Sequence, residues 1–178
     1  MTKKVLFVLM PEKFRDEEFS EPYEILKEKG YNITVAGFKA GVATGAGGYH
    51  CTVDTTLDAM KQSDFDAYDA LIIPGGPGST TYLWNNKPMQ EVIQYFHTKK
   101  KVVAAICYAV IALVQSQILA HKTATVYPTD EAKQILKEHD VAFVADGCVT
   151  LESDKIITAQ GPAFAKDFGH AICQLLEK

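Results

Sequence analysis

The chain has 178 residues, of which 47% are hydrophobic and 22% are charged, and its formal net charge at pH 7 is −4. This length and composition fit one globular domain, residues 1–178, with a sizeable core. The negative charge, with no basic stripe beyond residues 99–101, argues against a nucleic-acid partner. No apolar run approaches the roughly 20 residues that a membrane span needs, so we expect no membrane association.

The first half of the chain alternates apolar runs with amphipathic segments. Residues 4–10 are apolar, which predicts a buried first strand. Residues 17–29 predict a helix, because Phe19, Tyr23 and Leu26 share one face. The other elements expected here are a strand at 31–37, short β segments at the sheet edge within 40–53, a short helix at 56–60, a buried strand at 70–74 and an amphipathic helix at 88–99.

An apolar strand that runs directly into a helix dominates the second half. Residues 102–106 are wholly apolar, and residues 108–117 contain Ala and Leu without a helix breaker. Cys107 lies at the join. The other elements expected here are a strand at 124–127, a helix at 130–139, a strand at 141–144, a hairpin of residues 149–151 and 156–159, and a last helix at 163–176.

This alternation of strands and helices predicts an α/β fold. A mostly parallel central sheet would be covered by helices on both faces, with a small hairpin at one edge. Ligands of such sheets bind beyond the carboxyl ends of the strands. The loops at residues 10–18, 75–76 and 107–108 each follow an expected strand and should meet at that edge.

Cys107 is a candidate nucleophile because a sharp strand-to-helix turn exposes the side chain at its corner. The helix N-terminus would also favour a thiolate over a thiol. Against this, free cysteine is among the most buried residue types, and Ala105 and Ala109 stand where such turns usually have glycine. From this stretch alone, a catalytic and a core cysteine are nearly equally supported.

Adjacent glycines at Gly75 and Gly76 follow the strand at 70–74. Their backbone N–H groups could approach a ligand closely and, with the N–H of Tyr108, form an oxyanion hole. Glycine- and proline-rich runs are more often plain turns, so this segment gains weight only from its position before Cys107.

The cysteines give no sign of a metal site. They are far apart in sequence and form no C-x-x-C pair: Cys51, Cys107, Cys148 and Cys173. We therefore expect no metal and no cofactor, and reduced thiols in a cytoplasmic protein.

Five short motifs, in this order along the chain, resemble those of the ThiJ/PfpI superfamily, also called the DJ superfamily. They are residues 14–19 with Pro22, 73–76, 105–107, 127–128 and 160–162. The resemblance implies a flavodoxin-like three-layer sandwich of the class I glutamine amidotransferase type, and usually a homodimer or larger homo-oligomer.

The same resemblance implies roles for individual residues. Cys107 would be the reactive nucleophile and Glu18 the acid hydrogen-bonded to it, with Gly75, Gly76 and Tyr108 next to the substrate oxygen. We also place Tyr127, Gly161 and Pro162, which lie in two of the motifs, in the substrate site. The prediction therefore assigns Cys107, Glu18 and Tyr108 to catalysis.

Glu18 is one of three consecutive acids, Asp16, Glu17 and Glu18, at a helix start, where the helix dipole alone would favour acids. Alignment on Phe14 and on Pro22 both select Glu18. A buried carboxyl beside a thiolate should have a raised pKa and could move a proton in a carbonyl addition.

Two positions depart from the family pattern. Protease-like members carry His where this chain has Tyr108, and other members carry His where it has Tyr127. A phenol with an ordinary pKa of about 10 is a poor base at neutral pH, so a Cys–His pair for acyl transfer is not supported.

Three functions remain open. The leading hypothesis is a cofactor-independent enzyme on small reactive carbonyl compounds, glyoxalase- or deglycase-like, that uses Cys107 and Glu18. The second is a redox sensor or protective protein against oxidative stress, in which Cys107 is oxidised. The third is an intracellular cysteine protease or amidase, which would need a histidine near Cys107.

Overall fold

A seven-stranded sheet forms the centre of the molecule, in the order β11-β12-β8-β7-β1-β3-β6, and the computed structural model describes all residues 1–178. Only the β11–β12 pair is antiparallel. The strands are β1 (Lys4–Leu9), β3 (Asn32–Gly37), β6 (Thr55–Thr56), β7 (Ala70–Ile73), β8 (Val102–Ile106), β11 (Cys148–Leu151) and β12 (Ile156–Ala159).

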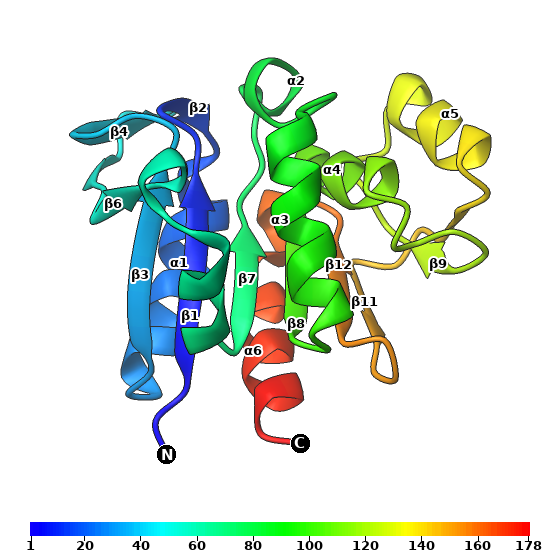
Figure 1. Cartoon of the computed structure of the whole chain (residues 1–178). Coiled ribbons are helices and arrows are strands. Elements are labelled where there is room, and N and C mark those ends of the chain that lie inside the picture. Colours follow the sequence, from blue (N-terminus) through cyan, green and yellow to red (C-terminus); the bar gives the residue numbers. More distant parts are fainter.

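Helices cover both faces of this sheet, as predicted. Figure 1 shows α3 (Lys87–Thr98) in front of β7 and β8, and α1 (Asp16–Glu28) and α6 (Ala165–Leu176) behind the sheet. Strands β7 and β8 are completely apolar and buried along their whole length, because helices remove both of their faces from water. The predicted α/β sandwich with an edge hairpin, β11–β12, is therefore confirmed.

The remaining elements are short and lie around the ends of the sheet. They are β2 (Glu12–Phe14), β4 (Val42–Gly45), β5 (His50–Thr52), η1 (Leu57–Ala59), η2 (Gln62–Ala67), α2 (Ser79–Tyr82), η3 (Cys107–Ala109), α4 (Val110–Gln115), β9 (Thr123–Ala124), α5 (Asp130–Glu138), β10 (Ala142–Phe143) and η4 (Pro162–Phe164). No helix is both long enough and apolar enough to span a bilayer.

The prediction for residues 40–53 was wrong about their place. These residues form β4 and β5, which join β2 in a separate three-stranded sheet instead of extending the main one. The Asp16 carboxylate accepts hydrogen bonds from the N–H groups of Gly47 (3.2 Å) and Tyr49 (3.3 Å). This small sheet is thereby tied to the start of α1.

The two strands expected at 124–127 and 141–144 are also different in the structure. Only β9 and β10, two residues each, are formed, and they pair with each other outside the main sheet. The position beside β8 is taken by β12, and β11 pairs with the other side of β12, so β9 and β10 have no place next to β8. The helix expected at 108–117 likewise begins with the η3 turn and ends at Gln115.

The loops after β1 and β7 pack so closely that one residue must be glycine. Gly76 has φ +121°, and an added Cβ would lie 2.3 Å from the Arg15 nitrogen and 2.8 Å from the Lys13 oxygen. Both neighbours are backbone atoms that no side-chain rotation can move. The contact fixes the relative position of the two loops.

We predict that Gly76→Ala destabilises the fold more than Gly41→Ala does. Both positions have positive φ, but a Cβ at Gly41 would meet nothing within 4 Å. Gly41→Ala should cost only the backbone strain of about 1–3 kcal/mol, and Gly76→Ala about 1–3 kcal/mol more through the clash. Urea unfolding of the three proteins measures this, and equal losses for the two variants would show that the contact is not tight.

Candidate active site

Three loops meet at the carboxyl ends of β1, β7 and β8, as the sequence predicted. The loop after β1 leads through Arg15 into α1, the loop after β7 contains Gly75 and Gly76, and Cys107 follows β8. The Arg15 N–H donates a 2.8 Å hydrogen bond to the Gly75 carbonyl, which joins the first two loops. The three neighbouring parallel strands therefore bring distant residues of the sequence to one place.

Cys107 occupies the sharp turn between β8 and the η3 turn, with a φ of +61°. A residue other than glycine in this region costs of order 1–3 kcal/mol and persists only where the surroundings hold it. Its side chain is 5% exposed, at the floor of a cavity. The predicted position of Cys107 at a strand-to-helix corner is confirmed.

Gly75, in the loop after β7, lies directly against the turn that holds Cys107. Because it has no side chain, it makes the close approach for which other such turns use a glycine beside the nucleophile. Ala105 and Ala109, on either side of the corner, are completely buried. A Cβ on Gly75 would lie 2.4 Å from the Ile106 oxygen and 3.0 Å from the Cys107 Cβ. The glycine that this packing needs is therefore in the loop after β7, and the positions on either side of the corner can be alanine.

Glu18 lies in the first turn of α1 and is completely buried. Neither of its carboxyl oxygens has a hydrogen bond of normal geometry. Burial raises the pKa of Glu18 to about 8, an effect that the nearby Cys107 thiol, Arg15 and the Gly75 N–H only partly offset. At neutral pH the carboxyl therefore keeps its proton in most molecules.

Burial also raises the pKa of the Cys107 thiol, and the negative charge of an ionised Glu18 raises it further. The N–H groups of Tyr108 and Gly76 act in the opposite direction. The lowered pKa expected from the helix N-terminus is therefore wrong, because desolvation outweighs it. When Glu18 is protonated, it no longer raises the pKa of Cys107 through its charge. The protonation of each group therefore depends on that of the other, and the two titrate as a coupled pair.

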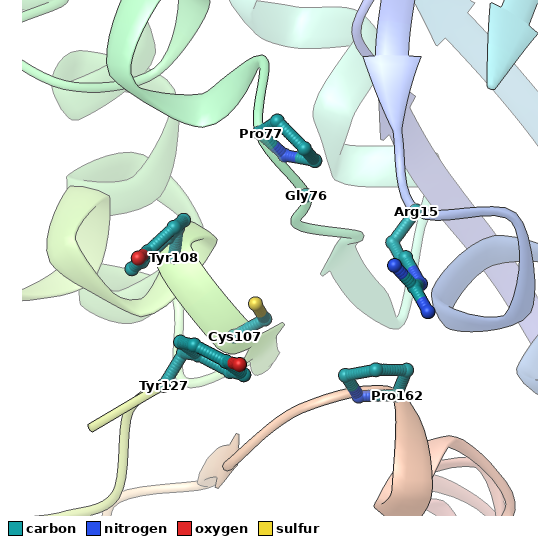
Figure 2. Close-up of a pocket in the computed structure, with 7 residues that line it drawn as sticks. All are labelled: Arg15, Gly76, Pro77, Cys107, Tyr108, Tyr127 and Pro162. Atoms are coloured by element: carbon teal, nitrogen blue, oxygen red, sulfur yellow. The ribbon is translucent and has the colours of Figure 1, made fainter. Parts of the chain in front are cut away.

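The three amide groups expected to surround a substrate oxygen divide between two partners. The N–H groups of Gly76 and Tyr108 interact with the Cys107 sulfur, whereas the N–H of Gly75 interacts with Glu18. In Figure 2 the Tyr108 hydroxyl points away from Cys107. Tyr108 thus presents its backbone, rather than its phenol, to the thiol.

A cavity of about 240 Å³ opens above Cys107 (Figure 2). Seven residues line it: Arg15, Gly76, Pro77, Cys107, Tyr108, Tyr127 and Pro162. The rings of Tyr108 and Tyr127 meet edge to face at 5.3 Å and form one wall. Trp84 supports this wall by donating a 2.8 Å hydrogen bond from Nε1 to the Tyr108 carbonyl.

The two other residues assigned to the substrate site are divided between neighbouring cavities. Pro162 lines the cavity above Cys107, but Gly161 lines only an adjoining one of about 360 Å³. Tyr127 and Pro162 border both cavities. A ligand that extends past Tyr127 would therefore reach Gly161.

Arg15 lines the cavity and was not assigned to the site from the sequence. It lies within the motif at residues 14–19, directly before α1, at the end of the loop that follows β1. Its position at the carboxyl edge of the sheet was the one feature of the sequence that could have indicated a role for Arg15 in the site. A single arginine next to three acids is more often a solvated surface residue.

No histidine is among the residues that line the cavity above Cys107. The five histidines are His50, His97, His121, His139 and His170. The structure also contains no group of three or more His, Cys, Asp or Glu side chains arranged to hold a metal ion. The arrangement offers a thiol, a carboxyl that can carry its proton, and backbone N–H groups at the same point.

Comparison with known proteins gives consistent matches over the whole chain. The model of the DJ-1/PfpI family matches residues 3–175. Uncharacterized protein MJ0967 of Methanocaldococcus jannaschii is 38% identical over 98% of this chain and 83% of its own. General stress protein 18 of Bacillus subtilis is 33% identical over the full length of both chains.

Two further matches are informative. Deglycase PfpI of Pyrococcus furiosus is 36% identical over 70% of this chain and 72% of its own. Among solved structures, a ThiJ/PfpI domain protein from Brachyspira murdochii superposes with a TM-score of 0.89 at 26% identity, over 99% of this chain and 97% of that one.

We predict that Glu18 makes the fold less stable as pH rises. A glutamate in an unfolded chain has a pKa of about 4.3, against about 8 here. Between these values the folded chain holds a proton that the unfolded chain has lost. The free energy of unfolding should therefore fall by up to about 1.4 kcal/mol per pH unit between about pH 5 and pH 7, with a shallower decline as pH rises through 8.

In Glu18→Gln this decline should be absent, and the variant should be more stable than the wild type at pH 8. Urea unfolding of both proteins from pH 5 to 8 tests the effect. Parallel stability curves would mean that the Glu18 carboxyl is not held in its protonated form.

Proposed function

This chain belongs to the DJ-1/PfpI family, and from that premise we propose that it is a cysteine-dependent enzyme that acts on small reactive carbonyl compounds. The observation that carries the proposal is the proximity of Cys107 to Glu18, whose buried carboxyl has no hydrogen bond of normal geometry to another group. A carboxyl with a pKa near neutrality can both give and accept a proton at working pH. A keto aldehyde requires both transfers.

The first step we propose is addition of Cys107 to the aldehyde. The reactive form of the pair has lost one proton to solvent and keeps the other on Glu18. The Cys107 thiolate then forms a C–S bond, and the carbonyl electron pair moves to oxygen. The N–H groups of Gly76 and Tyr108 lie beside the sulfur and would stabilise this oxygen. Glu18 then gives its proton to the oxygen, which yields a hemithioacetal.

The second step is an internal transfer of hydrogen. The Glu18 carboxylate removes the proton from the former aldehyde carbon and returns it to the adjacent ketone carbon, while the hydroxyl proton of the hemithioacetal passes to the ketone oxygen. The first carbon is thereby oxidised to a thioester and the second is reduced to an alcohol. Water then hydrolyses the thioester to a 2-hydroxy acid and regenerates the thiol, so neither an external oxidant nor a cofactor is consumed.

The name of Deglycase PfpI supports glycated amines as an alternative source of the same carbonyl carbon. An amine leaving group would need room beyond the reacting carbon. The adjoining cavity of about 360 Å³, reached past Tyr127 and Pro162, offers it. A protease or amidase is not proposed, because no histidine lines the cavity.

Oxidation of Cys107 is the second candidate function. The stress-related name of General stress protein 18, which matches the full chain, favours it. The same amide groups could hold an oxygen atom bound to the sulfur. Peroxide treatment that adds oxygen at Cys107, in a protein with no carbonyl turnover, would favour this function over the enzyme.

We predict that the purified protein converts methylglyoxal to lactate and that Cys107→Ser abolishes lactate formation. Loss of the thiol removes the C–S bond on which every later step depends. Cys51→Ser is the matched control, because Cys51 is partly exposed and does not line the cavity. Lactate must be measured, since a thiol can bind the aldehyde without converting it, and lactate from Cys107→Ser would refute the mechanism.

We also predict that Glu18→Gln lowers kcat by about 10²–10⁴-fold, the usual contribution of a positioned acid–base group. The amide keeps the shape of the side chain but cannot exchange a proton. Steady-state kinetics of the folded variant measure the effect. A kcat within threefold of the wild type would remove Glu18 from the mechanism.

A further inference from the structure

Arg15 has unused hydrogen-bonding capacity at the cavity. Its Nε donates to the Glu17 carboxylate at 3.0 Å, and the two side chains are 48% and 47% exposed. The structure shows no protein partner for the two terminal guanidinium nitrogens. The contact with Glu17 therefore uses only Nε and leaves the N–H groups of the two terminal guanidinium nitrogens, which form an outer fork, available to a ligand.

The position of this fork is opposite the catalytic thiol. Figure 2 shows the Arg15 side chain across the open space from Cys107, with Pro162 below it and the Tyr127 hydroxyl turned toward the same space. Arg15 comes from the segment that precedes α1 and Cys107 from the turn after β8, and both line the same cavity. A ligand bound at Cys107 would therefore share this cavity with the Arg15 guanidinium.

The charge of the cavity favours an anion near Arg15. Arg15 is the only basic residue among the seven that line it, and none of the seven is acidic. Glu17, which pairs with Arg15 through Nε, lies outside the lining and offsets part of this charge. Glu18, the nearest buried acid, keeps its proton at neutral pH in most molecules. A planar guanidinium with two free nitrogens matches the two oxygens of a carboxylate.

We propose that Arg15 binds a carboxylate on the substrate, and that the preferred substrates are keto aldehydes with a carboxylate at the opposite end of a short carbon chain. This inference rests on the proposed function and specifies its substrate class. The reaction is the one described above, with the aldehyde at Cys107 and the carboxylate unchanged. The compound 4,5-dioxopentanoate would take up one water and give 2-hydroxyglutarate.

The experiment compares two substrates in each variant. We measure kcat/KM for 4,5-dioxopentanoate and for the neutral 2-oxopentanal, and take their ratio. A hydrogen bond between charged groups leads us to expect this ratio to fall about 10- to 100-fold in Arg15→Gln. Arg15→Lys, which keeps the charge but loses the planar fork, should give an intermediate ratio.

Lys13→Gln is the matched control. Lys13 is an exposed cation two residues from Arg15 that does not line the cavity. It should keep the wild-type ratio, whereas an equal fall in Lys13→Gln would mean that only the general positive potential matters. A ratio that Arg15→Gln leaves unchanged, or equal losses on both substrates, would overturn the proposal.

A binding measurement separates this proposal from the enzymatic one. Levulinate carries a ketone and a carboxylate but no aldehyde, so it can bind without reacting. Calorimetry should show binding to wild type and to Cys107→Ser, and about 10- to 100-fold weaker binding to Arg15→Gln. If neither aldehyde is converted but this pattern holds, the proposed function fails and the carboxylate site stands; equal affinities for wild type and Arg15→Gln would refute the site.

Discussion

The candidate active site depends on one arrangement, a buried carboxyl placed beside a buried thiol. Taking an ionised carboxylate out of water is costly unless it is paired, so Glu18 retains its proton instead. The two groups come from α1 and from the end of β8, which lie far apart in sequence. Their contact requires Cys107 to hold a φ of +61° and Gly75 to approach the same turn without a side chain. The strain and the desolvation are tolerated because β1, β7 and β8 are buried on both faces and cannot easily yield.

The sequence predicted the central strands well because their apolar runs end abruptly at charged or glycine residues. Residues 102–106 show this at their start, where Lys101 precedes the run, and β8 has the predicted limits. The small sheet was missed because β2 has three residues, of which only Phe14 is apolar and buried. Alternation cannot be recognised over so short a run. The partner of residues 40–53 therefore could not be identified, and the main sheet was assumed in its place.

The candidate site was predicted less directly than the fold. Cys107 and the glycines follow from strand order, but Glu18 was selected only through resemblance to a family. Three adjacent acids at a helix start look alike in sequence, yet their environments differ completely. Asp16 binds the N–H groups of the small sheet, Glu17 binds Arg15, and Glu18 is buried beside Cys107. The burial of one and the exposure of its neighbours depend on how α1 docks on the sheet, which no local pattern specifies.

The wall formed by Tyr127 lies outside the central sheet. Tyr127 follows β9, in the segment that leads to α5, and is 42% exposed. The thiol and the carboxyl are held by the core, whereas this side of the cavity belongs to a peripheral unit with its own short ladder. Changes in length or sequence in that unit would alter the shape of the entrance at little cost to folding. Related proteins could therefore change their substrate range through the segment that contains β9, β10 and α5, while Cys107 and Glu18 stay the same.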